Sequence, residues 1–542
     1  MKRRQLFQVL DYLIVSLLVV SVVLFILVPF IFVFKEAIIS DHSLDFSSMV
    51  ALFKDQGKTI TNTLKMGLLT TIFSALASLA TAIIIYLSSK NMQRVLLTLL
   101  SITLISPPFV TSLSFINLFG RRGAITYHLL GLSMNPYGLW GIVMMQTISN
   151  LSLNSLLLFS FIKSIDQDII NSARNLGSNT NSLIKDIILP AARPGLKAVV
   201  LLSFFRSIAD FGTPAIIGGN FNVLAVESYF AVIAEGNLAK ASAINVLLLI
   251  PSLLMFLFYG RDFKSMAPTA AGVTSTSEIK IKKSGSLYYL LLTISGFFLL
   301  AVTILYAAIV MSAFTKFYQG QMYFTLENFV ETRPYITGTA IRSVVYSLIS
   351  AIFGSIIGLL IGYYLKIRKM RVMKYVDFFA NLPYIIPGTF FGLGYILAFK
   401  NPPLVLTGTA TIVVLNVLFK QLPFSSRMGV AAMEGISTDT LNSIRDLGGS
   451  RVDEIKDAVI PLSREALSVS FVNAFTTTMT TIGSIIFLIY PGQKVLTLVM
   501  FDVIQSAKYN VGAVIALMII VICLTVNGLY RLWMRRTNVS RS

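Results

Sequence analysis

The sequence predicts an all-α membrane protein made of two similar halves, each with six transmembrane helices. Three observations lead to this prediction: an apolar composition, twelve long apolar stretches and an internal repeat in the polar loops. Of the 542 residues, 55% are hydrophobic and 13% are charged, whereas an average soluble protein is about 25% charged. So few charges cannot cover a water-exposed surface, which excludes a water-soluble enzyme.

Twelve apolar stretches are long enough to cross a bilayer, which takes about 20 helical residues. Prolines interrupt the third stretch at Pro107-Pro108 and the ninth at Pro383 and Pro387, but membrane helices tolerate proline when neighbours satisfy the freed carbonyls. The first stretch follows Lys2-Arg3-Arg4 without a small-residue cleavage pattern, so we expect it to be retained as a helix. The twelve predicted spans are 12–34, 62–87, 95–118, 138–162, 198–218, 241–260, 286–312, 340–365, 376–399, 403–422, 467–490 and 511–530.

The charge distribution predicts the orientation. The chain has 44 Lys and Arg against 24 Asp and Glu, a formal net charge of +20. If the N-terminus is cytoplasmic, most of these basic residues fall in the cytoplasmic segments, Lys420 among them, as the positive-inside rule requires. Arg121-Arg122 is the main exception. We therefore expect a multi-pass membrane protein with both termini in the cytoplasm.

A repeated loop divides the chain into two. Residues 171–190 align without a gap with residues 442–461, and the identities include Asn, Arg, Gly, Lys, Asp and Pro. Chance similarity between apolar helices would match only aliphatic residues. Six spans separate the copies, so both face the same side of the membrane, which is a parallel repeat.

The repeat predicts three parts of the chain. Residues 1–260 form the first six-helix half, and residues 286–542 form the second. Residues 261–285 are polar, rich in Ser and Thr, and basic. This composition is typical of a linker, and the span count places it in the cytoplasm.

In the first copy, residues 166–176 are predicted to form a short amphipathic helix, with Ile169, Ile170, Ala173 and Leu176 on one face. Such a helix could pack its apolar face on the membrane bundle. Alternatively, two copies in symmetric loops fit a partner with two-fold symmetry.

A glycine and a proline follow each predicted helix. Gly177 and Gly448 supply a turn that residues with side chains resist. Pro190 and Pro461 are expected to mark the return toward the membrane.

This spacing resembles the cytoplasmic signature loop of the permease subunits of binding-protein-dependent ABC importers. Gly177 to Pro190 and Gly448 to Pro461 both keep that family's step of 13 residues. The resemblance implies a fused double permease with a type I-like importer fold. It also implies that residues 171–177 and 442–448 are coupling helices for two copies of an ATPase subunit, and that an extracytoplasmic binding protein delivers the substrate.

The resemblance further implies that the chain lies in a bacterial inner membrane and that ATP and Mg²⁺ bind to the partner ATPase subunits. This chain has no ATPase motif of its own, so we expect it to be a transport subunit rather than an enzyme and to bind no cofactor. It has one cysteine, Cys523, and two histidines, His42 and His128, which argues against a metal site built from these residues. Cys523 stands alone in an apolar stretch, so we expect it to have a packing role.

One position departs from the family pattern. The family's Glu is replaced by Asn171 in the first copy and by Asn442 in the second, so a salt bridge from that Glu to the ATPase is lost. Arg174 and Arg445 are then the preferred polar contacts with the ATPase. The alternative is that each is a solvated arginine on a helix face.

A second resemblance follows the first loop. Ala209-Asp210-Phe211-Gly212-Thr213-Pro214 and the residues up to Asn220 are similar to the ferric-iron branch of these permeases. Thiamine, phosphonate, polyamine and sugar-phosphate permeases are close relatives of that branch. Ferric iron is therefore the expected substrate, with the other four classes as alternatives.

Arg206 and Asp210 are opposite charges four residues apart in the fifth predicted span. On a helix they would share a face and neutralise each other. Because charges inside a membrane are costly, they indicate a functional site. Two roles remain open: the two residues line the translocation path, or they form a buried ion pair that locks the helix.

The repeat places hydroxyl groups opposite these charges. Positions 206 and 210 correspond to Thr477 and Thr481, and Gly212 corresponds to Gly483. The translocation path is therefore predicted to be charged on one side and lined by hydroxyls on the other, with the two glycines allowing close helix approach.

A different transport class remains open. Twelve-helix secondary transporters are also built from six-span halves, and an ion gradient drives them. In that case Arg206 and Asp210 would be the coupling site. The usual signature of that class, an acidic residue followed by Arg-Gly-Arg in the loop after the second span, is missing, since residues 88–94 read Ser-Ser-Lys-Asn-Met-Gln-Arg. A third class, a channel or membrane scaffold, does not explain the twin loops.

Overall fold

The computed structural model describes residues 2–40, 43–44, 52–107, 109–121, 123–132, 135–259, 284–318, 321–490 and 492–539. The predicted linker 261–285 lies almost wholly outside the described residues, as do Pro108 and Arg122. We refer to the described residues up to 259 as the first half and to those from 284 onward as the second half.

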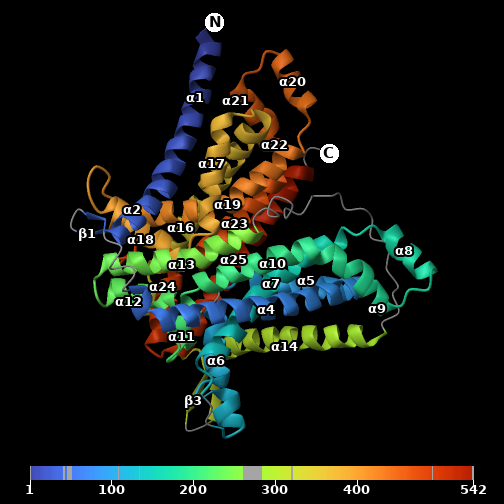
Figure 1. Cartoon of the computed structure of the whole chain (residues 1–542), viewed down its shortest axis with the longest axis vertical. Helices are drawn as coiled ribbons and strands as arrows, with labels where there is room; N and C mark the ends of the chain where they lie inside the picture. Colours follow the sequence, from blue (N-terminus) through green and yellow to red (C-terminus); the bar gives the residue numbers. More distant parts are fainter. Residues whose placement is uncertain are drawn as a thin grey trace.

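Helices dominate both halves, as predicted (Figure 1). The first half contains α1 (Lys2–Val22), η1 (Val23–Leu27), α2 (Val28–Ile38), α4 (Gly57–Leu87), α5 (Lys90–Leu104), α6 (Phe109–Phe119), η2 (Ala124–Leu129), α7 (Leu139–Lys163), α8 (Gln167–Asn175), α9 (Thr180–Ser182), η3 (Leu183–Ile188), α10 (Leu189–Ala209), α11 (Gly212–Ile217), α12 (Leu224–Ile233) and α13 (Leu238–Tyr259).

The second half repeats this order of elements. It contains α14 (Ser286–Phe314), α15 (Glu327–Ile336), α16 (Thr339–Gly362), η5 (Tyr363–Ile367), α17 (Arg371–Asn381), η6 (Leu382–Tyr384), α18 (Gly388–Phe399), α19 (Ala410–Glu434), α20 (Thr438–Asp446), α21 (Arg451–Asp453), η7 (Glu454–Val459), α22 (Ile460–Leu462), α23 (Arg464–Thr480), α24 (Leu496–Gln505) and α25 (Tyr509–Val539).

Two short antiparallel hairpins are the exceptions to the all-α prediction. Strands β1 (Ile39–Ser40) and β2 (Ser43–Leu44) follow α2, with Ile39 paired to Leu44. Strands β3 (Thr315–Tyr318) and β4 (Gln321–Phe324) follow α14, with Thr315 paired to Phe324. Each hairpin follows the first long helix of its half, so the repeat extends to these turns.

Eight helices of the described chain are long and apolar enough to cross a membrane, and α17 with α18 makes a ninth span if this pair, bent by 117°, counts as one. The third, tenth and eleventh predicted spans do not meet the same test. The third is divided between α5 and α6, and α23 has only 17 residues. α19 has 25 residues but carries charged side chains. On length and composition, nine of the twelve predicted spans are therefore supported.

The helix of the tenth predicted span extends further than predicted, because contacts with a neighbouring span accommodate a charged residue. The apolar reading ended at residue 422 and assigned Lys420 to the cytoplasm, yet α19 continues to Glu434. The Lys420 ammonium donates to the carbonyl oxygens of Pro383 at 2.8 Å and Ile386 at 2.5 Å. These carbonyls lie at the break between α17 and α18, so the break in this neighbouring span supplies the hydrogen-bond acceptors for the charge of Lys420.

The long helices run in two main directions. In Figure 1, α4, α7 and α10 of the first half run across the view, as does α14 of the second half, whereas α1 and α17 run up it. We call these two groups of helices the arms: α8 lies at the outer end of the first arm and α20 at the outer end of the second. Contacts between the halves include α11 with α24, α6 with α25, and α13 with α18.

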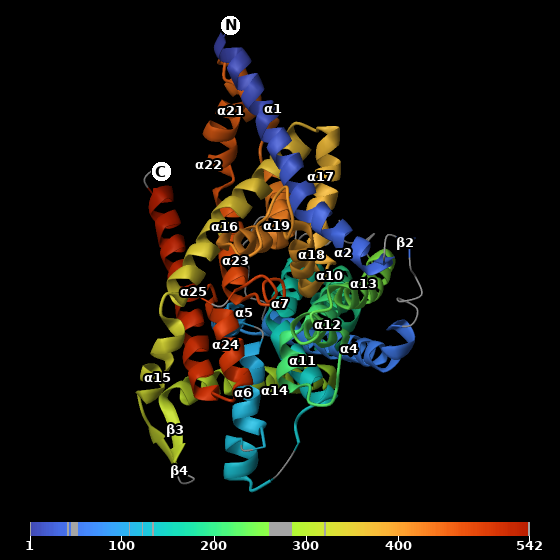
Figure 2. The same ribbon diagram turned by 90° about the vertical axis from the view of Figure 1, so that its left-hand side faces the viewer.

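The first helix of each half packs against the other half. α2 packs against α18, and α1 against α17 and α21 (Figure 2). In return, α14 packs against α4 and α6. The Tyr306 hydroxyl on α14 donates to the carbonyl of Thr103 at 3.1 Å, beside the break between α5 and α6. This exchange of helices binds the two halves into one body.

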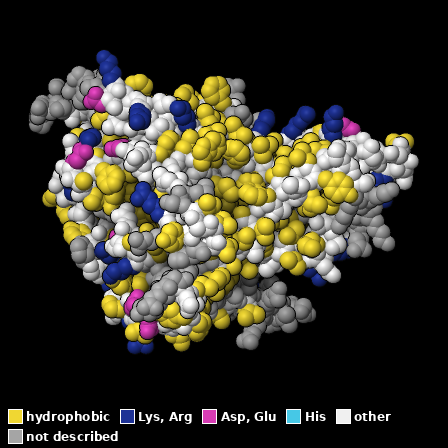
Figure 3. All heavy atoms as spheres, turned by 90° about the horizontal axis from the view of Figure 1, so that it is seen from below, with side chains coloured by type: hydrophobic (Ala, Val, Ile, Leu, Met, Phe, Trp, Pro, Cys, Tyr) yellow, Lys and Arg dark blue, Asp and Glu magenta, His cyan; other side chains and the backbone are white. Residues whose placement is uncertain are grey.

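Small residues let two helices of the second half approach closely. A Cβ atom built on Gly358 of α16 would lie 2.3 Å from the carbonyl carbon of Ser425 in α19, and one on Gly362 would lie 2.3 Å from that of Gly429. Such stripes of small residues drive helix packing where lipid removes the hydrophobic effect. Figure 3 shows hydrophobic side chains over a broad area of one face, with Lys and Arg mainly toward its margins.

Candidate coupling loops and membrane path

The first loop is a helix followed by a tight turn. The Asp166 side chain caps α8 by accepting from the amide of Asp168 at 2.9 Å. After the helix, Gly177 has a φ of +86°, and the amide of Ser178 donates to the carbonyl of Ala173 at 3.0 Å. A left-handed glycine with this backward hydrogen bond is a common helix end.

The second loop has the same construction. The Ser437 side chain caps α20 by accepting from the amide of Asp439 at 3.1 Å. Gly448 has a φ of +82°, and the amide of Gly449 donates to the carbonyl of Ile444 at 2.8 Å. The turn predicted at both glycines is therefore present in both copies.

α8 covers Gln167–Asn175, within the helix predicted for residues 166–176, and α20 covers Thr438–Asp446. Both helices begin before the coupling segments 171–177 and 442–448 that the resemblance implies, and each glycine lies beyond its helix. Asn171 and Asn442 are exposed in the middle of these helices, as a docking role requires.

The predicted apolar face of α8 is partly wrong. Ile170 is buried and Ala173 is half-buried, but Ile169 is exposed and Leu176 is 87% exposed. Leu176 lies after the helix has ended, so the helical period no longer carries its side chain to the inner face. The equivalent Leu447 is 89% exposed. Each loop thus presents one leucine to its surroundings.

Pro190 and Pro461 lie inside the helices that return to the membrane. A π-helical segment precedes each proline: η3 ends at Ile188 and η7 ends at Val459. Proline lacks an amide hydrogen and clashes with the carbonyl four residues earlier, and a wider π turn relieves that clash. In the first half, Thr180–Ala209 is one long helix, so Pro190 does not mark its start.

The two arginines of the loops differ. Among the residues that the structure describes, Arg174 has neither an ion pair nor a hydrogen-bond partner, and it is exposed. Arg445 instead donates from Nε and Nη2 to the carboxylate of Glu454, which is fully buried. The predicted contact with the ATPase therefore fits the exposed Arg174 better than Arg445, because Arg445 is already paired with Glu454 within the chain.

Arg206 and Asp210 do not form the predicted pair. α10 ends at Ala209, and Asp210 has a φ of −73° and a ψ of 110°, which turns it off the helix face. Its carboxylate accepts from the amide of Thr213 at 3.1 Å and from Nε2 of Gln146 at 3.0 Å. Within the described chain no salt bridge joins Asp210 to Arg206, whose Nη1 is buried without a hydrogen-bond partner. The two opposite charges still lie near enough to attract each other, but they do not form the direct salt bridge suggested as a helix lock.

Gln146 connects Asp210 to other helices of the first half. Its Oε1 accepts from the hydroxyls of Thr70 at 2.9 Å and Ser207 at 2.5 Å, while its Nε2 donates to Asp210. These residues come from α4, α7, α10 and the turn after α10. The network fixes the carboxylate at the point where α10 breaks.

The second half breaks at the equivalent point. α23 ends at Thr480, 271 residues after the end of α10. Thr477 and Thr481 are half-buried, and the Thr477 hydroxyl donates to the carbonyl of Asn473 at 2.6 Å. Gly212 is buried, and Gly483 approaches α18, where a Cβ on Gly388 would lie 3.1 Å from its carbonyl carbon. A Cβ atom on Gly483 itself would meet only the Cα of Gly388 at 3.8 Å, an ordinary contact, so the close helix approach predicted for the two glycines stays a prediction.

Comparison with known protein families agrees with this duplicated geometry. The family described as the binding-protein-dependent transport system inner membrane component matches residues 74–316 and again residues 354–539. These two matches cover most of the chain. The chain belongs to this family.

Two individual relatives are similar to this chain over most of its length. A ferric transport system permease protein FbpB from Actinobacillus pleuropneumoniae is 28% identical over 435 residues, which cover 78% of this chain and 63% of the relative. A putative ferric transport system permease protein FbpB 1 from Haemophilus influenzae is 30% identical over 404 residues, covering 72% of this chain and 64% of the relative. The matched region is thus less than two thirds of either ferric permease.

Two other relatives match shorter regions. A thiamine transport system permease protein ThiP from Salmonella typhimurium is 29% identical over 187 residues, covering 33% of this chain and 34% of the relative. A spermidine/putrescine transport system permease protein PotC from Escherichia coli is 25% identical over 195 residues, covering 36% of this chain and 69% of the relative. The fold and the fused two-repeat layout predicted from the loops are confirmed.

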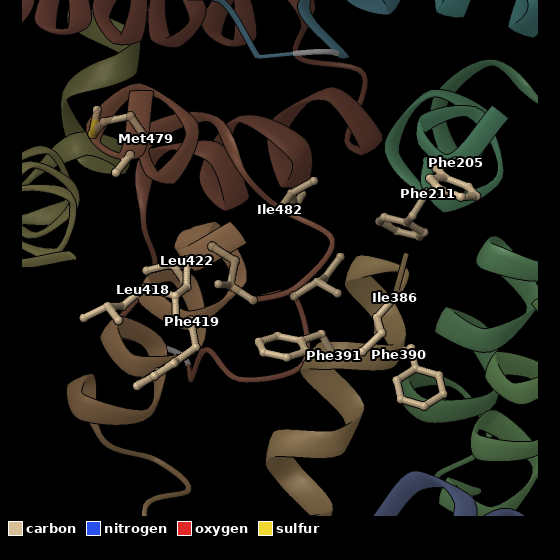
Figure 4. Close-up of a cluster of buried hydrophobic side chains, with 14 of the residues drawn as sticks. Phe205, Phe211, Ile386, Phe390, Phe391, Leu418, Phe419, Leu422, Met479 and Ile482 are labelled. Carbon is tan, nitrogen blue, oxygen red and sulfur yellow. The ribbon is translucent and has the colours of Figure 1, made fainter. Parts of the chain in front are cut away.

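The sequence reasoning missed a cluster of aromatic side chains between the two halves of this permease. The ring of Phe211 lies 4.8 Å from that of Tyr229 and 5.4 Å from that of Phe501, which belongs to the second half. Tyr229 also stacks on Phe487 at 6.3 Å. Figure 4 shows Phe211 close to Ile482 and Ile386 of the second half. Only tertiary packing brings these rings together, although Phe211 lies next to the predicted Asp210.

The described residues contain no group of three or more His, Cys, Asp and Glu side chains that could hold a metal ion. The lone Cys523 is buried in α25, in line with the packing role expected for it.

Proposed function

We propose that this permease moves ferric iron across a bacterial inner membrane, with ATP hydrolysed by two copies of a partner subunit that bind α8 and α20. An extracytoplasmic binding protein delivers the iron to the side opposite these helices. Both termini and both loops lie in the cytoplasm in this proposal.

The twin exposed leucines carry the proposal. Leu176 and Leu447 each stand directly before the glycine turn of their loop, and both are almost fully exposed although a leucine gains free energy on burial. The same exposed leucine at the same place in two repeated loops fits a contact with a partner that is itself present in two copies. Two identical ATPase subunits would meet two such sites.

The arrangement of the halves supports coupling. α8 and α20 lie at the outer ends of the two arms (Figure 1). Where the halves meet, Phe211 and Tyr229 of the first half contact Phe501 of the second, and we assign this aromatic cluster as the barrier across the path. Drawing the ends of the arms together would change the packing at their junction. ATP-driven closure of the partner subunits supplies such a movement.

Iron is proposed because two relatives are described as ferric transport permeases. The half-buried Asp210 carboxylate, fixed beside the barrier by Gln146 and Thr213, is a suitable attraction for a cation. Iron is a passing cargo in this proposal.

The test is transport by the reconstituted complex. The permease, its co-purified ATPase and the binding protein are placed in liposomes with ATP inside or outside, and uptake of radiolabelled ferric iron is measured. We expect uptake only when ATP is on the side of α8 and α20, and no effect of an uncoupler. Thiamine and spermidine serve as competing cargoes.

Two outcomes would overturn parts of this proposal. Uptake without any ATPase that collapses with an uncoupler would favour a secondary transporter. ATP-dependent uptake of thiamine or spermidine but not of iron would replace the cargo and leave the ATPase coupling intact.

A further inference from the structure

The second coupling loop contains a fully buried carboxylate. Glu454 in η7 has no exposed side-chain surface. It accepts hydrogen bonds from Arg445 of α20, from Nη1 of Arg451 at 2.7 Å and from the hydroxyl of Tyr363 at 2.8 Å. Arg445 lies in the last turn of α20, so Glu454 ties the end of this helix to α21 and η5. A buried charge with three donors is a strong local constraint.

The first loop lacks this constraint. The position equivalent to Glu454 is Leu183, whose side chain is buried among apolar residues. Arg174, the equivalent of Arg445, is exposed, and the described part of the chain gives it no acceptor. The polar link that holds α8 is a hydrogen bond of 3.3 Å from Nε2 of Gln167 to the Tyr86 hydroxyl. The helices match in sequence but differ in how they are fastened.

The constraint on α20 continues into the crossing helix α1. Tyr364, the neighbour of Tyr363, donates to Oδ1 of the buried Asp11 at 2.8 Å, and Arg368 donates to its Oδ2 at 3.1 Å. The rings of the two tyrosines lie 5.0 Å apart. An unbroken series of contacts therefore runs from α20 through Glu454 to α1, which begins in the first half.

We propose that Glu454 is a positioning residue that clamps the second coupling helix to η5 and, through η5, to α1, so that the two loops transmit ATPase movement unequally. α20 acts as a rigid lever, and α8 adjusts when its ATPase subunit binds. The clamp itself is a property of this chain, whereas its role in transport rests on the function proposed above.

The clamp predicts different local stability in two matched helices. Hydrogen bonds to charged groups contribute about 1.5–3 kcal/mol each, and 1.4 kcal/mol corresponds to a factor of about ten. Amide hydrogens of 438–447 should therefore exchange at least about tenfold more slowly than those of 167–176 in the same molecule. The first loop serves as an internal control.

The decisive variant is E454L, which installs the residue that the first loop carries at this position. Amide exchange of 438–447 should accelerate about tenfold and approach that of 167–176, which should not change. Y363F should give a smaller acceleration, because it removes one of the three donors. E465Q, at an exposed glutamate of α23, is the control and should leave both segments unchanged.

The functional readout is the amount of iron transported per ATP hydrolysed by the full complex in liposomes. E454L should lower this ratio at least about threefold while the ATPase still co-purifies, and E454D should restore part of it.

Equal exchange of the two helices in the wild-type protein, or no change in E454L, would overturn the clamp. A faster-exchanging α20 with an unaltered transport ratio would overturn its role in coupling. Absence of any ATPase from the wild-type complex would instead count against the proposed function and would leave the exchange result standing. Loss of folding in E454L is separated from these outcomes by E454Q, which keeps the shape of the side chain.

Discussion

Leu176 and Leu447 occupy the same place in two loops 271 residues apart, and their side chains are 87% and 89% exposed. Each leucine contributes little buried surface to the fold. Their repetition directly before the same glycine turn is the basis for proposing a contact outside the chain, and it makes them the most direct test of ATPase docking.

The double variant L176S/L447S should bind the ATPase much more weakly. Burial of a leucine side chain contributes about 1.5–3 kcal/mol, so the loss at each site corresponds to roughly 10- to 100-fold in affinity. Thermal stability of the permease alone should not change. Co-purification from detergent measures the effect. L129S, at an exposed leucine of η2, is the control, and an undiminished complex in the double variant would contradict the docking assignment.

Substitution of Gly177 or Gly448 should impair the protein because of the backbone conformation at these positions, not because the new side chain lacks space. Both have positive φ, and a Cβ atom on either would meet nothing within 4 Å. A β-branched residue there costs at least about 1–2 kcal/mol, whereas Asn tolerates the left-handed region. G448V should thus abolish transport without loss of membrane insertion, and G448N should retain a measurable rate. G57A, in open space without positive φ, is the control; equal loss in G448N and G448V would refute the conformational explanation.

Close packing of α16 on α19 should make Gly358 critical for stability. A Cβ atom there would overlap the backbone of Ser425, and overpacking costs about 1–3 kcal/mol or more. G358V should lower the melting temperature of the purified permease and its yield. G296V in α14 places the same side chain where a Cβ meets nothing within 4 Å. If both variants melt alike, the two helices do not depend on this contact.

A substitution at Asp210 can separate the effect of its negative charge from the effect of its hydrogen bonds. D210N keeps an oxygen that can accept from the amide of Thr213, but it removes the negative charge near the barrier. If the charge attracts a cation, D210N should lower iron uptake at least about tenfold with little change in melting temperature. Q146L, which removes the partner in α7, should instead lower stability first. Full iron uptake by D210N would limit Asp210 to a structural role.

The stability of the second loop should depend on pH only in the acid range. Burial by itself would raise the pKa of Glu454, but hydrogen bonds from Arg445 and Tyr363 and the charge of Arg451 hold this pKa below its ordinary value. A group with a lowered folded pKa stabilises the native state above its unfolded pKa and loses this contribution as the pH falls. Protection of 438–447, corrected for intrinsic exchange, should therefore be constant down to a pH of about 4.5 and fall below it. In E454L this acid step should be absent.

The sequence alone determined the class of protein, the two-fold repeat and both coupling loops. Long apolar runs can only be accommodated in a bilayer as helices, and a gap-free repeat of polar residues at one offset leaves little freedom in how the halves correspond. Gly177 and Gly448 were predicted correctly because a helix end with positive φ is a local property of the chain.

Only the tertiary structure decided how charges inside the membrane are satisfied. Lys420 was predicted to be cytoplasmic, but it lies within α19 because the carbonyls of the bent span are close enough to receive it. Asp210 lies just beyond the end of α10, where Gln146, 64 residues earlier, donates a hydrogen bond that no local pattern reveals. The pairing of Arg445 with Glu454 likewise depends on side chains that meet in space, whereas its absence at Arg174 follows from Leu183 at the position equivalent to Glu454. Periodicity records which residues share a helix face, whereas the partners of buried polar groups depend on which helices pack together.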